Sequence, residues 1–205
     1  DASKHPGSII RINLDGSIPE DNPKFINQPN WLAEIYQIGI RNPQGMTLSP
    51  YDNQIYISNH GPMGGDFIGI VHHSGNYGWK EVGWGGKNYD GSKIGEGKPF
   101  EEKFDKPLIS WVPSIAPSNI QFYNKNMFED LKGKLIITSL KYNMLLKLEI
   151  KNNKVIDKEI ILRGCRVHKK PCYNIGRIRD IETGQDGSIY IITDEKKFSL
   201  IKKSK

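Results

Sequence analysis

Residues 46–59 read MTLSPYDNQIYISN, and two later stretches repeat the same order of features. Residues 120–139 (IQFYNKNMFEDLKGKLIITS) and 181–194 (IETGQDGSIYIITD) each place a polar turn before a β-rich run that ends in Ser, Thr, Asn or Asp. Small antiparallel sheets in series give such an internal repeat, which is typical of β-propeller blades. A β-sandwich is the alternative, but a sandwich does not require this internal similarity. We therefore predict an all-β chain built from propeller blades.

Strands for about three and a half to four blades, each a four-stranded antiparallel sheet, can be found along the chain. Because a closed propeller needs about four to eight blades, we predict that residues 1–205 form one portion of a propeller domain whose other blades lie upstream of Asp1. The stretch from Gly61 to Pro113 is rich in Gly and aromatic residues and breaks the strand rhythm. We expect it to form an elaborated functional face.

The chain carries 29 basic and 23 acidic residues, a net charge of +6. Two explanations of this positive charge are open. Scattered lysines can serve solubility alone, or the charge can serve to bind an anionic partner. No helix-turn-helix, zinc-finger or RNP-type stretch is present, so we expect no nucleic-acid partner. No apolar run approaches the roughly 18 residues that span a bilayer, so we expect no membrane span. Nucleophile-elbow, dinucleotide-binding and P-loop motifs are also missing.

Four basic residues lie at or just beyond the ends of predicted strands, and Asn42 adds an amide beside one of them. They are Arg41, Lys141, Arg177 and Arg179. Matching ends of successive blades converge on the channel of a propeller, so these cations would line one pocket. Arginine suits bidentate recognition of carboxylates, and lysine acts as a point charge. The alternative is a set of salt-bridged surface residues, with Asp180 as a partner for Arg179.

The sequence HGPMGGD, residues 60–66, predicts either a plain turn or a cation site. The backbone carbonyls of Gly61 and Pro62 and the carboxylate of Asp66 are oxygen ligands of the kind that calcium prefers. His60 is a candidate base, although a lone histidine is more often a hydrogen-bonded structural residue.

Two cysteines, Cys165 and Cys172, flank a basic loop. Two cysteines without a CxxC motif disfavour a zinc site. A disulfide in an exported protein and two unrelated thiols both remain open.

Six motifs occur in one order along the chain: YQIGIRNPQGMTLSP, NHGPMGGD, NYGW, WVPSIAPS, SLK and GRIRD. With these motifs the sequence resembles the glucose/sorbosone dehydrogenase family, which includes soluble aldose sugar dehydrogenases that use pyrroloquinoline quinone. The resemblance runs over almost the whole chain. It implies part of a six-bladed β-propeller, matching the C-terminal portion of the family fold.

The resemblance implies a role for each candidate residue. The cofactor carries three carboxylates and an ortho-quinone, which Arg41, Asn42, Lys141, Arg177 and Arg179 would contact, with Ser139 and Leu140 alongside. The carbonyls of Gly61 and Pro62 resemble those that hold a cofactor-bound calcium in some relatives, where the cation would act as a Lewis acid. Tyr77 matches a residue of a structural calcium site.

The sequence departs from the family pattern at four points. The family's catalytic base is a histidine in an earlier blade, and none of His5, His60, His72, His73 and His168 lies in such a context. Phe67 stands where a glutamate ligand of the structural calcium is usual, so we expect that site to be weakened or lost. Asn59 also replaces a common glutamate, and the cysteine-bearing loop resembles an insertion.

The implied function is oxidation of an aldose at C1 to the lactone, with hydride transfer to pyrroloquinoline quinone. A small-molecule sugar is then the substrate, the location is periplasmic or secreted, and a homodimer is one assembly to test. The alternative is an inactive propeller fragment that binds a polyanion or a protein partner. A lactonase-like propeller is a weaker third reading, because it needs several carboxylates around a metal.

Overall fold

The structure, a computed structural model, describes residues 2–24, 30–165 and 167–203. Strands and one 3₁₀ turn, Glu129–Leu131, are its only regular elements within these ranges. The strands are β1 (Ile9–Ile10), β2 (Ile35–Gln37), β3 (Pro43–Leu48), β4 (Ile55–Asn59), β5 (Asp66–Ile70), β6 (Ile109–Trp111), β7 (Pro117–Phe122), β8 (Leu135–Ser139), β9 (Met144–Lys151), β10 (Lys154–Arg163), β11 (Ile178–Thr183), β12 (Ile189–Thr193) and β13 (Phe198–Ile201). The described part of the chain has no helix with the length and apolar character needed to cross a bilayer.

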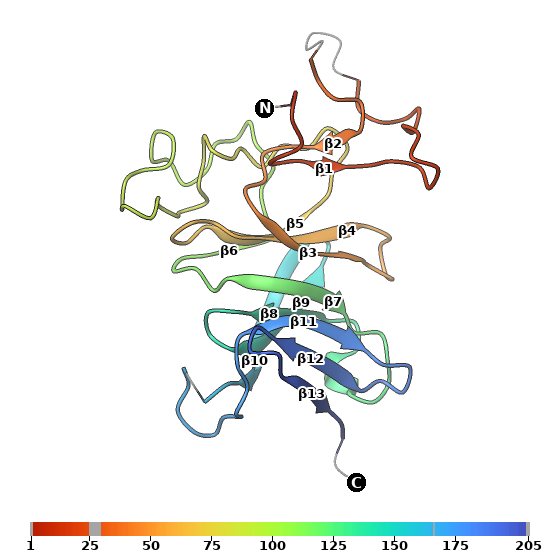
Figure 1. The fold of residues 1–205 in the computed structure, drawn as a ribbon, viewed down its shortest axis with the longest axis vertical. Coiled ribbons are helices and arrows are strands. Elements are labelled where there is room, and N and C mark those ends of the chain that lie inside the picture. The colour runs from red at the N-terminus through yellow and green to blue at the C-terminus, as the bar shows by residue number, and fades with distance from the viewer. Residues whose placement is uncertain (1, 25–29, 166, 204–205) are drawn as a thin grey trace.

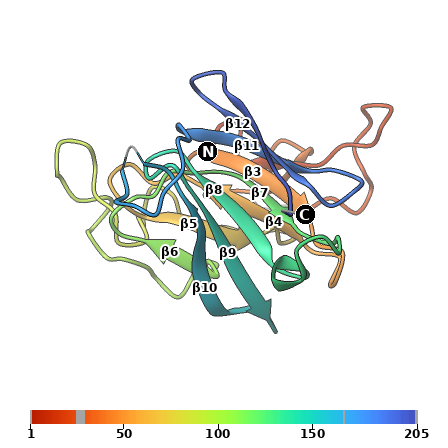
Figure 2. The same ribbon diagram turned by 90° about the horizontal axis from the view of Figure 1, so that it is seen from below.

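The strands form four antiparallel sheets that follow one another along the chain. The two full sheets have the orders β3-β4-β5-β6 and β7-β8-β9-β10, the last has the order β11-β12-β13, and β1 pairs with β2. Figure 1 shows the sheets stacked along the long axis, and Figure 2 shows them from below. This arrangement confirms the predicted partial propeller, although the first sheet has two strands and the last has three.

Turn chemistry and the burial pattern explain the strands. Asn152 and Asn153 have φ values of 50° and 55°, which the tight β9–β10 hairpin requires and which asparagine tolerates. In β12, Ile189 and Ile191 are buried, whereas Ile192 on the other face is exposed. The period of two that indicated strands therefore separates a packed face from an open one.

Apolar side chains fill the space between successive sheets. Tyr56 and Ile68 of the β3–β6 sheet pack with Ile120 and Leu135 of the β7–β10 sheet. Tyr56 also meets Phe122 edge to face, with ring centroids 5.0 Å apart. A second cluster, which includes Leu145, Ile178 and Ile191, joins the β7–β10 sheet to the last one. Each blade is thus held by burial against its neighbour rather than by pairing across sheets.

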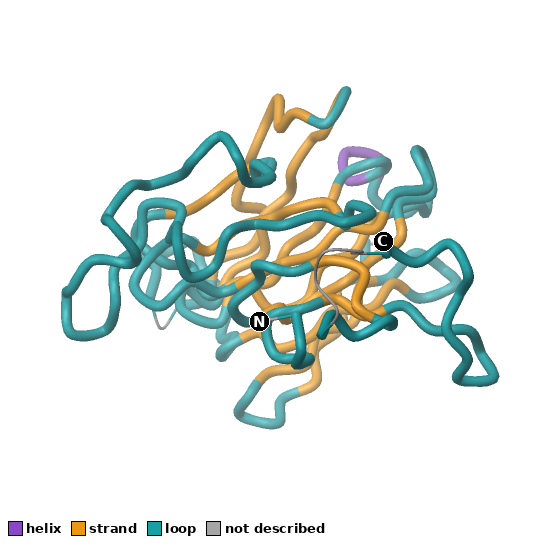
Figure 3. The backbone as a smooth tube through the Cα atoms, turned by 90° about the horizontal axis from the view of Figure 1, so that it is seen from above, coloured by secondary structure: helices purple, strands orange, loops and turns teal. Residues whose placement is uncertain are grey.

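The interval from Gly61 to Pro113, predicted to form an elaborated functional face, contains two strands, β5 and β6, of the β3–β6 sheet. All five residues of β5 are buried, so this strand lacks the alternation by which half-buried strands are recognised. The long connection over 71–108 is irregular, apart from one-residue bridges to Ile38 and Met63. Figure 3 shows strands in the middle of the molecule and loops around them.

Candidate functional site

Strands β3, β7 and β11, the first strands of three consecutive sheets, begin on the same side of the stack. Strand β3 packs against β7, and β7 packs against β11. The Ser58 hydroxyl donates to the carbonyl oxygen of Ser118 (2.6 Å), and the Ser118 hydroxyl donates to that of Ile178 (2.7 Å). A Cβ at Gly45 would lie 2.7 Å from the Ser118 carbonyl oxygen, so this close approach requires glycine. The residues that precede β3, β7 and β11 are thereby brought close together on one side of the stack.

Arg41, which precedes β3, is held between two aromatic rings. Its guanidinium carbon lies 5.4 Å from the Trp79 ring centroid and 5.7 Å from that of Tyr89, distances typical of cation–π contacts. Its Nη1 donates to the carbonyl oxygen of His60 over 3.3 Å. The buried Asn59 accepts the backbone N–H groups of Arg41 and Asn42 on its Oδ1, at 3.1 Å and 2.8 Å. This explains the use of an amide oxygen at position 59.

Asp194 joins the two arginines at the start of β11. Its carboxylate accepts from Nε of Arg177 at 3.0 Å and from Nε of Arg179 at 2.8 Å. These bonds, with Arg179 the larger contributor, lower the pKa of Asp194 below its ordinary value. Arg179 also donates to Oε1 of Gln44 over 3.1 Å, and Gln44 in turn donates to Oδ1 of Asn42 over 2.9 Å. The two arginines and the Arg41–Asn42 pair therefore belong to one hydrogen-bonded group.

The alternative pairing of Arg179 with Asp180 does not occur. Asp180 instead accepts a hydrogen bond from Nδ2 of Asn119 at 2.5 Å. Sequence reasoning missed Asp194 and Gln44 as members of the site. A signal for both existed, because Asp194 ends the third repeated unit and Gln44 follows the Arg41–Asn42 pair by two residues.

The SLK segment follows β8 and reaches the same end, but its residues differ in accessibility. Ser139 is buried, donates to the carbonyl oxygen of Ile115 at 2.5 Å and accepts from the backbone N–H of Tyr142 at 3.1 Å. Leu140 is also buried, so both side chains shape the segment from inside. Lys141 is exposed, and its Nζ lies 5.4 Å from the Tyr142 ring centroid. Only Lys141 in this segment presents a charge to solvent.

His60 is half-buried beside the arginines. Its Nε2 lies 2.7 Å from the carbonyl oxygen of Pro117, so the neutral ring donates through Nε2. Burial lowers the pKa of His60, Asp66 opposes this, and Arg179 and Arg41 lower the pKa further. The imidazole is therefore neutral near pH 7 and serves as a structural donor, in agreement with the structural interpretation of a lone histidine.

Asp66 is fully buried and fastens the loops around Gly61. Its Oδ1 accepts from the Gly61 N–H at 2.8 Å, and its Oδ2 accepts from the Ile115 and Ala116 N–H groups at 2.8 Å and 2.7 Å and from the Ser114 hydroxyl. With this many donors the carboxylate is engaged as a structural acceptor. It is not free to bind a metal.

The residues named for calcium differ in how well they fit it. The described residues contain no group of three His, Cys, Asp or Glu side chains that could hold a metal. The Tyr77 hydroxyl is bonded to both the N–H and the carbonyl of Ile70, at 2.7 Å each, and its ring packs 4.7 Å from that of Phe67. These contacts do not fit a calcium ion at Phe67 and Tyr77. Among the described residues, no backbone hydrogen bond to the carbonyl oxygens of Gly61 and Pro62 is found, so the calcium role of these two residues stays a prediction.

The structure brings the candidate cations together. Three guanidinium groups, an exposed lysine and an amide lie on one side of three consecutive sheets. Asp194 forms ion pairs with Arg177 and Arg179, as the alternative of salt-bridged surface residues requires, although the partner is not Asp180. The fold and this group together define a propeller segment with a cluster of cations where its strands begin.

The chain belongs to the glucose/sorbosone dehydrogenase family, whose model matches residues 1–202. It is 39% identical over 207 residues to aldose sugar dehydrogenase YliI of Escherichia coli (strain K12), covering 100% of this chain and 52% of that protein. It is 27% identical over 249 residues to quinoprotein glucose dehydrogenase B of Acinetobacter calcoaceticus, covering 95% of this chain and 49% of that protein.

The crystal structure of the soluble aldose sugar dehydrogenase from Escherichia coli in the apo-form superposes with a TM-score of 0.83 at 38% identity. The match covers 98% of this chain and 55% of that structure. The chain therefore spans about half the length of the relatives it matches.

Proposed function

We propose that the protein is a pyrroloquinoline quinone-dependent sugar dehydrogenase to which this chain contributes the side chains that grip the cofactor. The observation that carries the proposal is the clustering of Arg41, Arg177 and Arg179 on one side of the stack. Asp194 accepts hydrogen bonds from Arg177 and Arg179, and Gln44 is hydrogen-bonded to both Arg179 and Asn42, the residue after Arg41. The names of the relatives, aldose sugar dehydrogenase and quinoprotein glucose dehydrogenase, support the same chemistry.

When bound, the quinone supplies the acceptor for a hydride from C1 of an aldose, which leaves as the lactone. The residues of this chain hold and orient that acceptor. Arg177 and Arg179 offer planar donors already fixed by Asp194, and Lys141 adds a point charge. Arg41 is fixed by Trp79 and Tyr89, so little side-chain entropy is lost when it binds an anion.

The base that takes the sugar hydroxyl proton is not assigned within this chain. His60 uses Nε2 on the Pro117 carbonyl, and burial favours its neutral form. We propose that the base comes from the upstream blades, as the family resemblance implies. The carbonyls of Gly61 and Pro62 are our candidates for a cofactor-bound calcium.

Closure by further blades is supported by exposed apolar side chains on two of the sheets. On β3, Met46 (50% exposed) and Leu48 (58%) lie on the face away from the β7–β10 sheet. On the last sheet, Ile192 (47%) and Phe198 (65%) are paired across β12 and β13 on the face away from the core. We propose that residues 1–205 are one portion of a propeller whose upstream blades cover both faces.

Labelling of full-length protein tests this closure. Phe198→Cys should react slowly with a maleimide, whereas Ile156→Cys, at a 52% exposed position on the outermost strand β10, should react quickly. The measurement is made across protein concentrations, because protection that rises with concentration would instead indicate a homodimer. Fast reaction of Phe198→Cys at every protein concentration contradicts both the closure by further blades and the homodimer.

Cofactor titration of the full-length protein tests the function. With calcium present, we expect micromolar quinone binding and aldose-dependent dye reduction. Arg177→Ala should weaken quinone binding by about 10- to 100-fold, since a hydrogen bond to a charged group contributes about 1.5–3 kcal/mol. Lys154→Ala is the matched control, because Lys154 begins β10 at the opposite end of the sheet.

The alternative is an inactive propeller that binds a polyanion or a protein partner. Phe67, at the position where the family uses a calcium ligand, is the observation that favours it. Quinone binding without turnover on any aldose would contradict the dehydrogenase and support this alternative. Export to the periplasm follows only from the family resemblance and is tested by cell fractionation of the full-length protein.

A further inference from the structure

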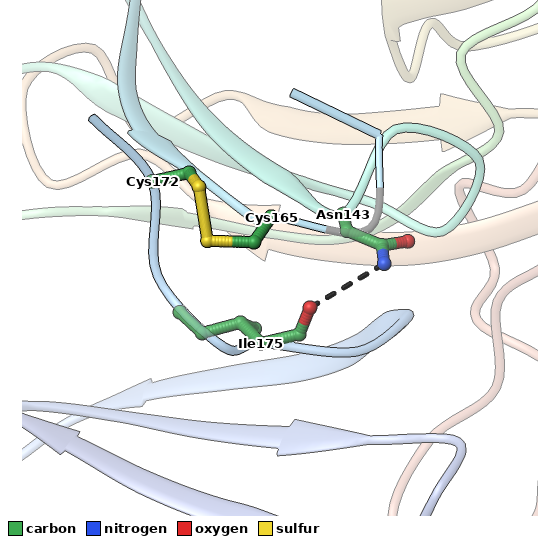
Figure 4. The surroundings of a disulfide bond; sticks show 4 residues. All are labelled: Asn143, Cys165, Cys172 and Ile175. Carbon is green, nitrogen blue, oxygen red and sulfur yellow. Dashed lines mark hydrogen bonds between the residues drawn. A yellow bond between two sulfur atoms is a disulfide. The ribbon is translucent and has the colours of Figure 1, made fainter. Parts of the chain in front are cut away.

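The disulfide Cys165–Cys172 lies in the connection between β10 and β11, among segments that carry two of the candidate cations. One segment, residues 140–143, follows β8 and carries Lys141. The other, residues 173–177, leads into β11 and carries Arg177. Figure 4 shows the disulfide beside Asn143 and Ile175, one residue from each segment.

Asn143 joins the two segments directly. Its carbonyl oxygen accepts from the Gly164 N–H at 2.8 Å, and its Nδ2 donates to the carbonyl oxygen of Ile175 at 3.4 Å, as Figure 4 shows. The residue is 1% exposed, so these bonds are shielded from water. Asn143 lies two residues after Lys141, and Ile175 lies two residues before Arg177.

The two ends of the loop closed by the disulfide are hydrogen-bonded to each other. The Cys165 N–H donates to the Tyr173 carbonyl at 2.7 Å, and the Tyr173 N–H donates to the Arg163 carbonyl at 2.8 Å. A Cβ at Gly164 would lie 2.7 Å from the carbonyl oxygen of Asn143 and 2.8 Å from that of Ile175. Gly164 therefore occupies the point where both segments meet, and a larger residue would push them apart.

A histidine ties the loop to the Lys141 segment. Nε2 of His168 lies 2.9 Å from the carbonyl oxygen of Tyr142, the residue after Lys141. His168 sits between the two cysteines in the sequence, so the disulfide limits how far its ring can move from Tyr142. The loop thus contacts Tyr142, which follows Lys141, and Tyr173, which lies four residues before Arg177.

We propose that the Cys165–Cys172 disulfide is a positioning element that fixes Lys141 and Arg177 relative to each other for the anionic cofactor. This rests on the proposed function for the identity of the ligand. A dithiol reductant would open the loop: the S–S bond takes up two electrons and two protons to give two Cys thiols, and the dithiol becomes a cyclic disulfide. Cofactor affinity of the protein then depends on the thiol–disulfide state of this loop.

Hydrogen exchange in the cofactor-free, full-length protein tests the positioning without relying on the ligand. In Cys165→Ser/Cys172→Ser protein, the amides of Gly164, Tyr173 and Ile175 should exchange at least about tenfold faster than in the oxidised protein, because they lose the closure that holds their acceptors. Amides of the buried strand β8 should be unchanged. Equal exchange of the loop-flanking amides in both proteins overturns the proposal.

Quinone titration then measures the consequence for binding. The Cys165→Ser/Cys172→Ser protein should bind quinone about tenfold more weakly. Wild-type protein that is reduced with a dithiol and then freed of the dithiol by anaerobic desalting before the quinone is added should bind as weakly as the variant, and the same treatment should leave the variant unchanged. Gly164→Ala should weaken binding with the disulfide intact. Ile191→Val, a core change on β12 away from the loop, controls for general loss of stability. Unchanged affinity in the double variant and in Gly164→Ala overturns the proposal.

A full-length protein that binds no quinone in either thiol state contradicts the proposed function instead. The exchange rates of the flanking amides still decide whether the disulfide holds the two segments together. The two failures are therefore distinguishable.

Discussion

Replacing Asp66 by Asn should be among the most damaging single-atom changes in this chain. The carboxylate accepts three backbone N–H groups and one hydroxyl in a site with no solvent access. An asparagine keeps only one of the two oxygens. Its amide nitrogen is itself a donor and cannot accept the hydrogen bonds of the donors that it faces. If the oxygen stays on Gly61, the N–H groups of Ile115 and Ala116 lose their acceptor.

The magnitude follows from these two orphaned donors. A buried donor without a partner costs about 1–3 kcal/mol, so the free energy of unfolding should fall by about 2–6 kcal/mol. Urea denaturation of full-length Asp66→Asn, followed by circular dichroism and by tryptophan fluorescence, measures this loss. Quinone affinity should fall as well, because the loops that carry Gly61 and residues 114–116 lose their common anchor.

Asp90→Asn is the matched control for this prediction. Asp90 is exposed and accepts only from the backbone N–H and hydroxyl of Ser92 within its own turn. The same change there should leave the midpoint of unfolding nearly unchanged. If Asp66→Asn destabilises the protein no more than Asp90→Asn does, the assignment of Asp66 as a buried anchor is wrong.

Three further predictions concern the same end of the molecule. Burial lowers the pKa of His60 below its ordinary value of about 6.5, so the unfolded protein binds a proton more readily than the folded protein does. The free energy of unfolding should therefore be lower at pH 5.5 than at pH 7 in urea denaturation. His60→Gln should remove this difference. The hydrogen bonds from Arg179 and Arg177 lower the pKa of Asp194, so the stability difference between wild type and Asp194→Asn should be constant from pH 7 to pH 5 and shrink only below about pH 4. Gly45→Ala would place a methyl group 2.7 Å from the Ser118 carbonyl and should cost about 1–3 kcal/mol by urea denaturation; a stable Gly45→Ala would show that β3 can move away from β7.

Much of the fold could be predicted because its signals are local. The repeated units around residues 46–59 and 181–194 combine turn residues with alternating burial, and both features depend on neighbours in sequence. The buried strand β5 was hidden because it packs on both faces and shows no alternation. The cations Arg41 and Arg177 could be grouped as candidates because they stand at strand ends.

The partners within the site could not be predicted because they form across long separations. Asp66 accepts hydrogen bonds from three residues that follow it in the sequence by 48 to 50 positions, and Gln44 accepts a hydrogen bond from Arg179, which follows it by 135 positions. The sequence contains several acids that could have paired with Arg179, and only the packing of β11 against β12 selects Asp194 over Asp180. The disulfide was likewise one of two open alternatives in the sequence, and the structure decides it by placing the Cα atoms of the two cysteines 4.9 Å apart.

The two hydroxyl bonds from Ser58 to Ser118 and from Ser118 to Ile178 have a mechanical consequence. They connect the first strand or its neighbour in each of three consecutive sheets, so tilting one sheet would stretch a bond in the next. The strand ends that carry the candidate cations are therefore tied together by a line of buried hydrogen bonds. If an anion binds there as proposed, little reorganisation of the wall would be needed, and selectivity would depend on whether the carboxylates of the ligand match the spacing of the cations.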